Sequence, residues 1–397
     1  MSLFSKDSQQ DDEITKKGIL TLVLSRGLTQ LPSAVVGLLL VEIALSYNVQ
    51  VGVAGQINTA AGLFSIFFGL AMGVLSVKYQ HKSLLFTGIL LYVFFAVSSY
   101  FSTSLTVLIG VYSLVGIANA LVLPMVNTLI GELVSPERRT SVIGWTVGGM
   151  SLIYFIGVLS AGFLSNLGWK MTMVLVVVPV GVLTCIMCRN FVPSQNKGSE
   201  NKVSFRELFT GYMKLLRNKS AIGCILGTIL SFSVWYFYLV YGVSYFREVF
   251  QISPSSMSVI MIFFIVFFII GSLSAGRVVK RFNEKTSLLI FTGGLGIVTI
   301  FVFHIPNFWA AFLITLIACF SAGAMITVSS SYALSQIPEY SGTMMSLHAA
   351  ADSFGSAISS GLGGTFLLLY GYRIGSSILG VFGVIGAVIL LLFTSKQ

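Results

Sequence analysis

The sequence predicts an all-α membrane protein with twelve transmembrane helices in two pseudo-symmetric six-helix bundles. Three observations predict it: a composition too apolar for a soluble protein, twelve long apolar runs, and motifs that recur between the two halves. Of 397 residues, 55% are hydrophobic and only 9% are charged, whereas soluble proteins carry about 25% charged residues because water must wet their surface. The composition therefore excludes a soluble enzyme, a secreted disulfide scaffold and a disordered protein.

Twelve apolar runs are each long enough to cross a bilayer, because about 20 helical residues span roughly 30 Å of hydrocarbon. We predict spans at 17–46, 50–77, 83–102, 105–130, 140–166, 170–190, 220–246, 256–279, 286–304, 307–333, 342–369 and 374–394. One long polar stretch, 193–219, follows the sixth run. We therefore expect a cytoplasmic tail at 1–16, a six-helix bundle at 17–191, a linker at 192–219 and a second six-helix bundle at 220–397.

Within the linker, apolar side chains recur at helical spacing beside basic ones, which is typical of an amphipathic helix lying on the membrane surface. They are Phe205, Leu208, Phe209, Tyr212 and Leu215, next to Arg206, Lys214 and Arg217. A solvated connector is the alternative, and the pattern favours neither.

The basic residues predict the orientation. All but four of the 23 Lys and Arg residues fall in the termini and the even-numbered connections; the exceptions are Lys170, Arg247 and Arg373 in odd-numbered connections and Arg26 inside the first span. By the positive-inside rule, both termini and the linker are cytoplasmic, as in a multi-pass protein of the cytoplasmic membrane. Because the charges are spread over loops, the net charge of +10 does not predict nucleic-acid binding.

Short motifs in the first half recur in the second half at nearly one offset. Gly73–Lys82 matches Gly276–Lys285, Pro136–Glu137 matches Pro338–Glu339, and Gly168–Lys170 matches Gly371–Arg373, at offsets of 203, 202 and 203 residues. These repeats predict a duplicated six-helix unit, with the halves related by an axis along the membrane normal and a substrate site between them near the midplane.

These motifs resemble those of the major facilitator superfamily, and more loosely of its drug and sugar efflux branch, over essentially the whole chain. The family's loop signature G-x-L-a-D-R-x-G-R-K is matched at Gly73, Leu75, Lys78 and Lys82, and P-E-x-R at Pro136, Glu137 and Arg139; Val51–Gly62 also looks like the efflux branch. The signature Asp is replaced by Val77 and Lys280, and Tyr112 stands where proton-coupled drug exporters carry Arg. The resemblance implies alternating access and secondary active transport, while these departures argue against reading drug/proton antiport from the motifs alone.

Ionisable residues inside predicted spans are costly and usually line a cavity. Asp352 follows Ser341 by eleven residues, about 16 Å along a helix, so we expect it near the bilayer centre, with Arg26 at a similar depth. We predict that Asp352 carries a coupling proton with His348, one turn away, as its pH-sensitive partner, and that Arg26 binds substrate. The alternatives are a structural Arg26–Asp352 pair, an Arg26 side chain that extends to the interface, and a packing role for His348.

Other polar and aromatic residues extend the predicted site. Gln30 lies one turn from Arg26, Asn119 lies on a polar stripe of the fourth span, and the seventh span is rich in aromatic residues that include Trp235 and Tyr238. Such aromatic residues suit an organic ligand or, alternatively, an aromatic belt near the outer interface. We predict substrate contacts at Arg26, Gln30, Asn119, Trp235 and Tyr238.

Gates are predicted at both ends of the site. Gly73, Lys78, Gly276 and Arg281 lie near the cytoplasmic ends of the second and eighth spans, and Glu42 lies near the outer end of the first. Glycine pairs such as Gly144 and Gly148 allow helices to approach closely and slide.

The sequence has no P-loop, H-E-x-x-H or plausible Ser/His/Asp set, so we expect no enzyme activity, cofactor or metal. The predicted function is proton-coupled efflux of a small organic solute across the lipid bilayer by a monomer. The alternatives are uptake or exchange of an organic anion with Arg26 as carboxylate clamp, and a gradient-independent uniporter. An anionic substrate would need Arg26 without an acidic partner, whereas a neutral or cationic solute would favour an Arg26–Asp352 pair.

Overall fold

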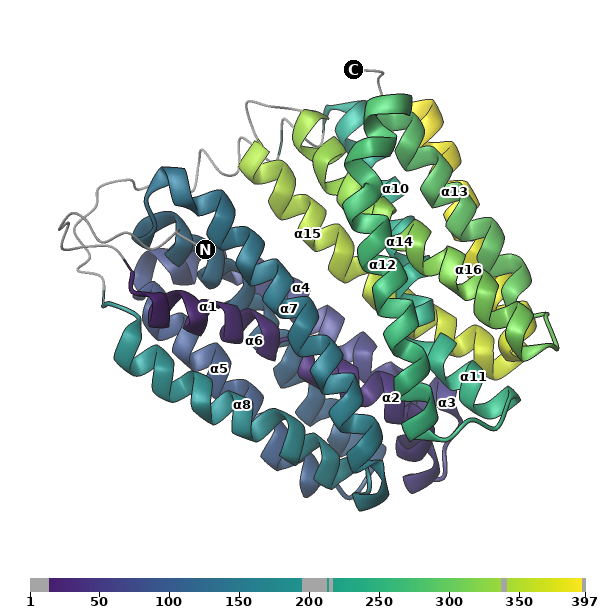
Figure 1. Cartoon of the computed structure of the whole chain (residues 1–397), viewed down its shortest axis with the longest axis horizontal. Helices are drawn as coiled ribbons and strands as arrows, with labels where there is room; N and C mark the ends of the chain where they lie inside the picture. The colour runs from purple at the N-terminus through teal and green to yellow at the C-terminus, as the bar shows by residue number, and fades with distance from the viewer. Residues whose placement is uncertain (1–13, 195–212, 214–216, 337–340, 395–397) are drawn as a thin grey trace, which may run out of the picture.

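The structure, a computed structural model, describes residues 14–194, 213, 217–336 and 341–394 (Figure 1). This part of the chain is helical and contains no strand. Eleven of its segments are long and apolar enough to cross a membrane. The predicted N-terminal tail and the predicted amphipathic helix of the linker lie outside the described residues.

The first helices form an N-terminal group, α1–α8. They are α1 (Lys16–Leu28), α2 (Leu31–Ser46), α3 (Val51–Ala54), α4 (Gln56–Lys78), α5 (His81–Tyr100), α6 (Leu105–Leu133), α7 (Pro136–Leu164), the short η1 (Ser165–Leu167) and α8 (Trp169–Phe191). Large buried side chains such as Tyr92, Phe95 and Tyr112 fill its interior.

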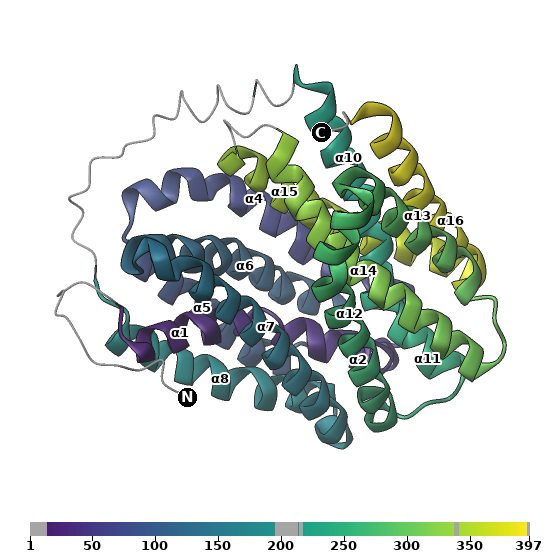
Figure 2. The same cartoon turned by 45° about the horizontal axis from the view of Figure 1, so that its top comes forward.

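The remaining helices form a C-terminal group, α10–α16, which lies beside the first (Figures 1 and 2). They are α10 (Lys219–Phe237), the π-helical turn η2 (Tyr238–Gly242), α11 (Val243–Val249), α12 (Pro254–Phe282), α13 (Glu284–Val302), α14 (Phe308–Gln336), α15 (Ser341–Ile358), the π-helical turn η4 (Ser359–Gly363) and α16 (Gly364–Phe393). Phe237, Phe303 and Tyr332 are among its fully buried side chains.

Two predicted spans differ in detail from the structure. The first is broken between α1 and α2 at Thr29 and Gln30, just before Pro32, which has no backbone N–H to continue the hydrogen-bond ladder. The predicted spans 342–369 and 374–394 lie in one apolar helical segment, Leu347–Phe393. That segment bends at Gly371, whose φ of +72° is readily adopted only by glycine.

Equivalent contacts 203 residues apart accompany the sequence repeat. The Lys82 Nζ donates to the carbonyl oxygen of Arg189 at 3.0 Å, and the Lys285 Nζ donates to that of Leu391 at 2.9 Å. In both halves a lysine thus satisfies carbonyl groups near the end of a helix, where the helix itself offers no donor.

We call the end of the molecule where α1 begins and α16 ends the terminal end, and the opposite end the far end. The two groups meet at the far end (Figure 1). There Gly52 packs so closely on α16 that a Cβ atom would lie 2.5 Å from the carbonyl oxygen of Gly364. Similarly, a Cβ atom on Gly62 of α4 would lie 3.2 Å from the Cβ of Ala357 on α15.

The groups separate toward the terminal end. A Cβ atom on Gly162 of α7 would lie 2.2 Å from the Ser258 Oγ of α12, whereas one on Gly144 or on Gly276 would have nothing within 4 Å. Gly144 lies 18 residues before Gly162 on α7, and Gly276 lies 18 residues after Ser258 on α12. Eighteen residues are five helical turns, or about 27 Å, so each pair lies on one face of its helix. These faces touch at the far end and are open at the terminal end.

Candidate functional site

Arg26 lies in the last turn of α1 and is held by neutral side chains. Its Nη1 donates to the Asn127 Oδ1 of α6 at 3.2 Å and, more weakly, to the Thr146 Oγ1 of α7 at 3.5 Å. Its Nε is buried and has no hydrogen-bond partner. Among the side chains that the structure describes, no carboxylate lies within 4.0 Å of this guanidinium.

The polar residues predicted near Arg26 have partners within the N-terminal group. Gln30 Nε2 donates to the Thr29 Oγ1 at 3.0 Å, in the break between α1 and α2. Asn119 Oδ1 accepts a hydrogen bond from the buried Tyr92 hydroxyl. Ser33 is exposed although its neighbours along α2 are buried, so this position faces the open space between the helix groups.

Asp352 lies on α15, in the other group, and the Tyr236 hydroxyl of α10 lies beside its carboxylate. Its Oδ1 is buried without a hydrogen-bond partner. The two helices are close together here, because a Cβ atom on Gly355 would lie 2.6 Å from the Cβ of Phe232. The alternative of a structural Arg26–Asp352 ion pair is therefore not what the described residues form in this conformation.

His348 takes part in a separate polar chain inside the C-terminal group. Its Nε2 lies 3.0 Å from the Ser329 Oγ, which in turn lies 3.2 Å from the Thr228 Oγ1. The imidazole also meets the ring of Phe232 edge to face at 5.8 Å. His348 is buried and contacts Ser329 rather than Asp352.

The aromatic residues of α10 and η2 point in different directions. Trp235 is half-buried and stacks on Phe268 of α12 at 5.2 Å. Tyr238 is buried against Phe303, with ring centroids 5.5 Å apart. Tyr236, which lies between them in sequence, approaches Asp352, and sequence reasoning did not single it out because the angular position of α15 relative to α10 is a tertiary feature.

An ion pair joins the two groups at the far end. Both guanidinium Nη atoms of Arg247 on α11 donate to the two carboxylate oxygens of Glu42 on α2. Arg247 is only 8% exposed, and its Nη1 also donates to the carbonyl oxygen of Leu38 at 2.9 Å. Glu42 was predicted to gate this end, whereas its partner Arg247 was assigned to a loop.

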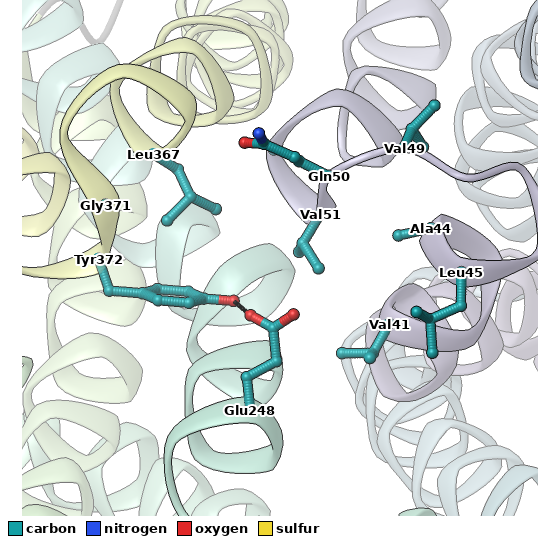
Figure 3. A pocket seen from close by; sticks show the side chains of 11 residues that line it. Val41, Ala44, Leu45, Val49, Gln50, Val51, Glu248, Leu367, Gly371 and Tyr372 are labelled. Carbon is teal, nitrogen blue, oxygen red and sulfur yellow. Dashed lines mark hydrogen bonds between the residues drawn. The ribbon is translucent and has the colours of Figure 1, made fainter.

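Further contacts close the far end around this ion pair. The Tyr241 hydroxyl donates to the carbonyl oxygen of Ser360 at 2.7 Å, and Gln56 Nε2 of α4 donates to that of Gly361 at 3.1 Å. A pocket of about 250 Å³ lies at this junction and is lined in part by Val41, Val51, Leu367, Glu248 and Tyr372 (Figure 3). Within it, the Tyr372 hydroxyl donates to Glu248.

The predicted gate at the terminal end is open where it can be described. Gly276 faces open space, and Arg281 is exposed, with its guanidinium 5.4 Å from the centre of the Phe282 ring. Gly73 and Lys78 belong to α4, and their surroundings lie outside the described residues. Within the described ranges, no three His, Cys, Asp or Glu side chains gather to hold a metal ion.

Comparison with known proteins relates the whole chain to one family. The family described as Major Facilitator Superfamily matches residues 22–347 and 224–397. The uncharacterized MFS-type transporter YwfA of Bacillus subtilis (strain 168) is 23% identical over 407 residues, which cover 98% of this chain and 96% of that protein.

Solved structures share the fold. A bacterial homolog of the human lysosomal transporter Spinster, in an inward-facing and unoccupied conformation, gives a TM-score of 0.80 at 16% identity over 94% of this chain and 95% of that chain. The nucleoside transporter NupG gives 0.78 at 11% identity over 95% and 100% of the two chains. A D-xylose-proton symporter gives 0.77 at 16% identity over 96% and 98%.

Proposed function

Because this chain belongs to the Major Facilitator Superfamily, we propose that it moves a small organic solute across the membrane as its two helix groups close alternately at the far end and at the terminal end. The observation that carries this proposal is the contrast between the two ends. Glu42 and Arg247 close the far end, while Gly144 and Gly276 face open space at the terminal end.

The proposal assigns the terminal end to the cytoplasm, because the positive-inside rule favours basic residues on that side. It counts the apolar segment Leu347–Phe393 as two spans divided at Gly371, since 47 helical residues are about twice the length that one crossing needs. The chain then has twelve spans in two bundles, and the described conformation is open to the cytoplasm.

The opposite conformation follows from the helix faces. Gly144 and Gly276 each lie five turns from the contact between Gly162 and Ser258. If α7 and α12 rock about their middle, the far-end contact opens as these two glycines approach. Glycine suits such a contact because it lets two helix backbones come close.

Asp352 is the proposed proton carrier. Its carboxylate lies among α15 and α10 residues with one oxygen unpartnered, and a buried carboxylate exchanges protons readily when its surroundings change between two states. Proton-coupled efflux remains the proposed mode, with the direction resting on the resemblance of Val51–Gly62 to the efflux branch. The order in which solute and proton bind is left to experiment.

The test is flux into and out of liposomes that contain the purified protein, with and without an imposed pH gradient. We expect gradient-driven accumulation with the native protein. Asp352→Asn, which cannot titrate, should lose it while keeping solute exchange at equal pH. Asp352→Glu, which keeps a carboxyl group, is the matched control and should retain coupling. Undiminished gradient-driven accumulation by Asp352→Asn would exclude Asp352 as the proton carrier.

A further inference from the structure

We propose that Arg26, Asn127 and Thr146 form a binding site for the carboxylate group of an organic anion. This inference rests on the proposed function and names its substrate class. The starting point is a contrast between two arginines. Arg247 has a carboxylate and a carbonyl oxygen as partners, whereas the contacts of Arg26 are with one amide and one hydroxyl.

A guanidinium shielded from water normally has an anionic partner, because neutral hydrogen bonds do not replace its lost hydration. The described carboxylates have partners elsewhere: Glu42 binds Arg247, Glu132 binds His81, and Asp352 lies beside Tyr236. The missing counter-charge at Arg26 is therefore assigned to the solute.

The free edge of the guanidinium has the right shape for a carboxylate. Its Nη1 atom is used by Asn127 and Thr146, so Nε and Nη2 remain as two parallel donors. Two such donors match the two oxygens of one carboxylate, a bidentate arrangement that lysine does not reproduce.

Asn127 orients the site and opens it to the solute. Its Oδ1 accepts from Arg26, which leaves the hydrogens of Nδ2 to donate to an anion. Asn127 is exposed and lies on α6 in the half that leads to the terminal end, where the helix groups are apart. Thr146 donates its own hydrogen to the carbonyl oxygen of Ile143 at 2.8 Å, so its oxygen remains an acceptor for Arg26.

A carboxylate fits this site better than a phosphate. One guanidinium and one amide balance a single negative charge, and no second cation contacts Arg26 among the described side chains. Inorganic phosphate, with nearly two charges at neutral pH, would leave one of them without a partner.

The test is ligand-dependent thermal unfolding of the full-length protein in detergent. The probes are acetate, pyruvate, benzoate and indole-3-acetate, each compared with its uncharged amide, and inorganic phosphate as a separate arm. A ligand that binds only the folded state raises the unfolding temperature in a dose-dependent way. We expect at least one carboxylate, but not its amide and not phosphate, to do so.

Variants connect this shift to the site. Arg26→Gln should abolish it, Arg26→Lys should weaken binding at least tenfold, and Arg189→Gln, which removes an exposed arginine, should leave it unchanged. Asn127→Asp would place a counter-charge beside Arg26, so it should raise the unfolding temperature without ligand and also abolish the carboxylate shift. That pair of effects keeps the test valid if Arg26→Gln does not fold.

Three outcomes would overturn the inference: no carboxylate acting more strongly than its amide, a shift that persists in Arg26→Gln, or a shift that persists in Asn127→Asp. A larger shift with phosphate than with every carboxylate would replace the proposed ligand class. Binding is measured without transport, so a carboxylate shift in a protein that moves no solute would contradict the proposed function alone.

Discussion

Replacing Glu42 with Gln should weaken closure of the far end. The Glu42–Arg247 pair joins α2 to α11 across the two helix groups, so it can exist only when the far end is closed. Gln keeps the size of the side chain and one acceptor but removes its charge. Arg247, which is only 8% exposed, then lies in the closed state without a counter-charge.

The size of the effect follows from the burial of the pair. Removing one partner of a fully buried ion pair costs about 3–5 kcal/mol. The Glu42 side chain is 27% exposed and one hydrogen bond survives in the variant, so we expect about 2 kcal/mol. That corresponds to about a 30-fold shift toward the state that is open at the far end.

The assay is pulsed electron–electron distance measurement between spin labels on Gln50 and Val249. Both side chains are exposed at the far end, one in each helix group, and the four native cysteines would first be replaced. Glu42→Gln and Arg247→Gln should each increase the population of long distances. The double variant should show less than the sum of the two effects, because the residues act as one interaction.

Glu248→Gln is the matched control. Glu248 follows Arg247 in the chain but binds Tyr372 within the same helix group, so its loss should leave the distances unchanged. If Glu42→Gln gives the same distance distribution as Glu248→Gln, the ion pair does not hold the far end closed.

Three further predictions concern packing. Gly52→Ala should shift the same distance distribution toward the open far end, because its Cβ would lie 2.5 Å from a backbone oxygen of α16; an unchanged distribution would show that this approach is unimportant. Gly276→Leu should fold and bind solute normally, since it now faces open space, yet it should lose most liposome transport because the terminal end cannot close; normal transport would contradict that. Tyr92→Phe should destabilise the protein by about 1 kcal/mol, because the buried Asn119 loses its donor; thermal unfolding measures this, and an unchanged unfolding temperature would argue that water replaces the hydroxyl.

Local features of the chain were enough to predict the helical membrane fold. Long apolar runs gave the spans because hydrocarbon thickness sets their length, and the family resemblance is confirmed by the match over most of the chain. The bend at Gly371 was less predictable. Whether the chain ends one span and begins another there depends on a single φ angle within a continuous apolar segment.

Pairings between distant helices could not be predicted from spacing. Glu42 was recognised because a carboxylate inside a span is rare, but its partner Arg247 lies 205 residues away and was taken for a loop residue. The contact between Tyr236 and Asp352 likewise depends on how α10 and α15 are rotated against each other. The roles predicted for Arg26, Asp352 and His348 remain predictions, although their partners are now defined.

The most direct test of alternating closure is disulfide cross-linking of two cysteine pairs in membranes. Gly62→Cys with Ala357→Cys probes the far end, where the Cβ positions are 3.2 Å apart, slightly closer than the usual disulfide range of about 3.5–4.5 Å. Gly144→Cys with Gly276→Cys probes the terminal end, which is open in this conformation. We predict that both pairs cross-link under mild oxidation, that each cross-link stops transport until it is reduced, and that solute changes the two yields in opposite directions. Failure of the Gly144–Gly276 pair to cross-link under any condition, together with normal transport when the far-end pair is fully cross-linked, would contradict alternating closure.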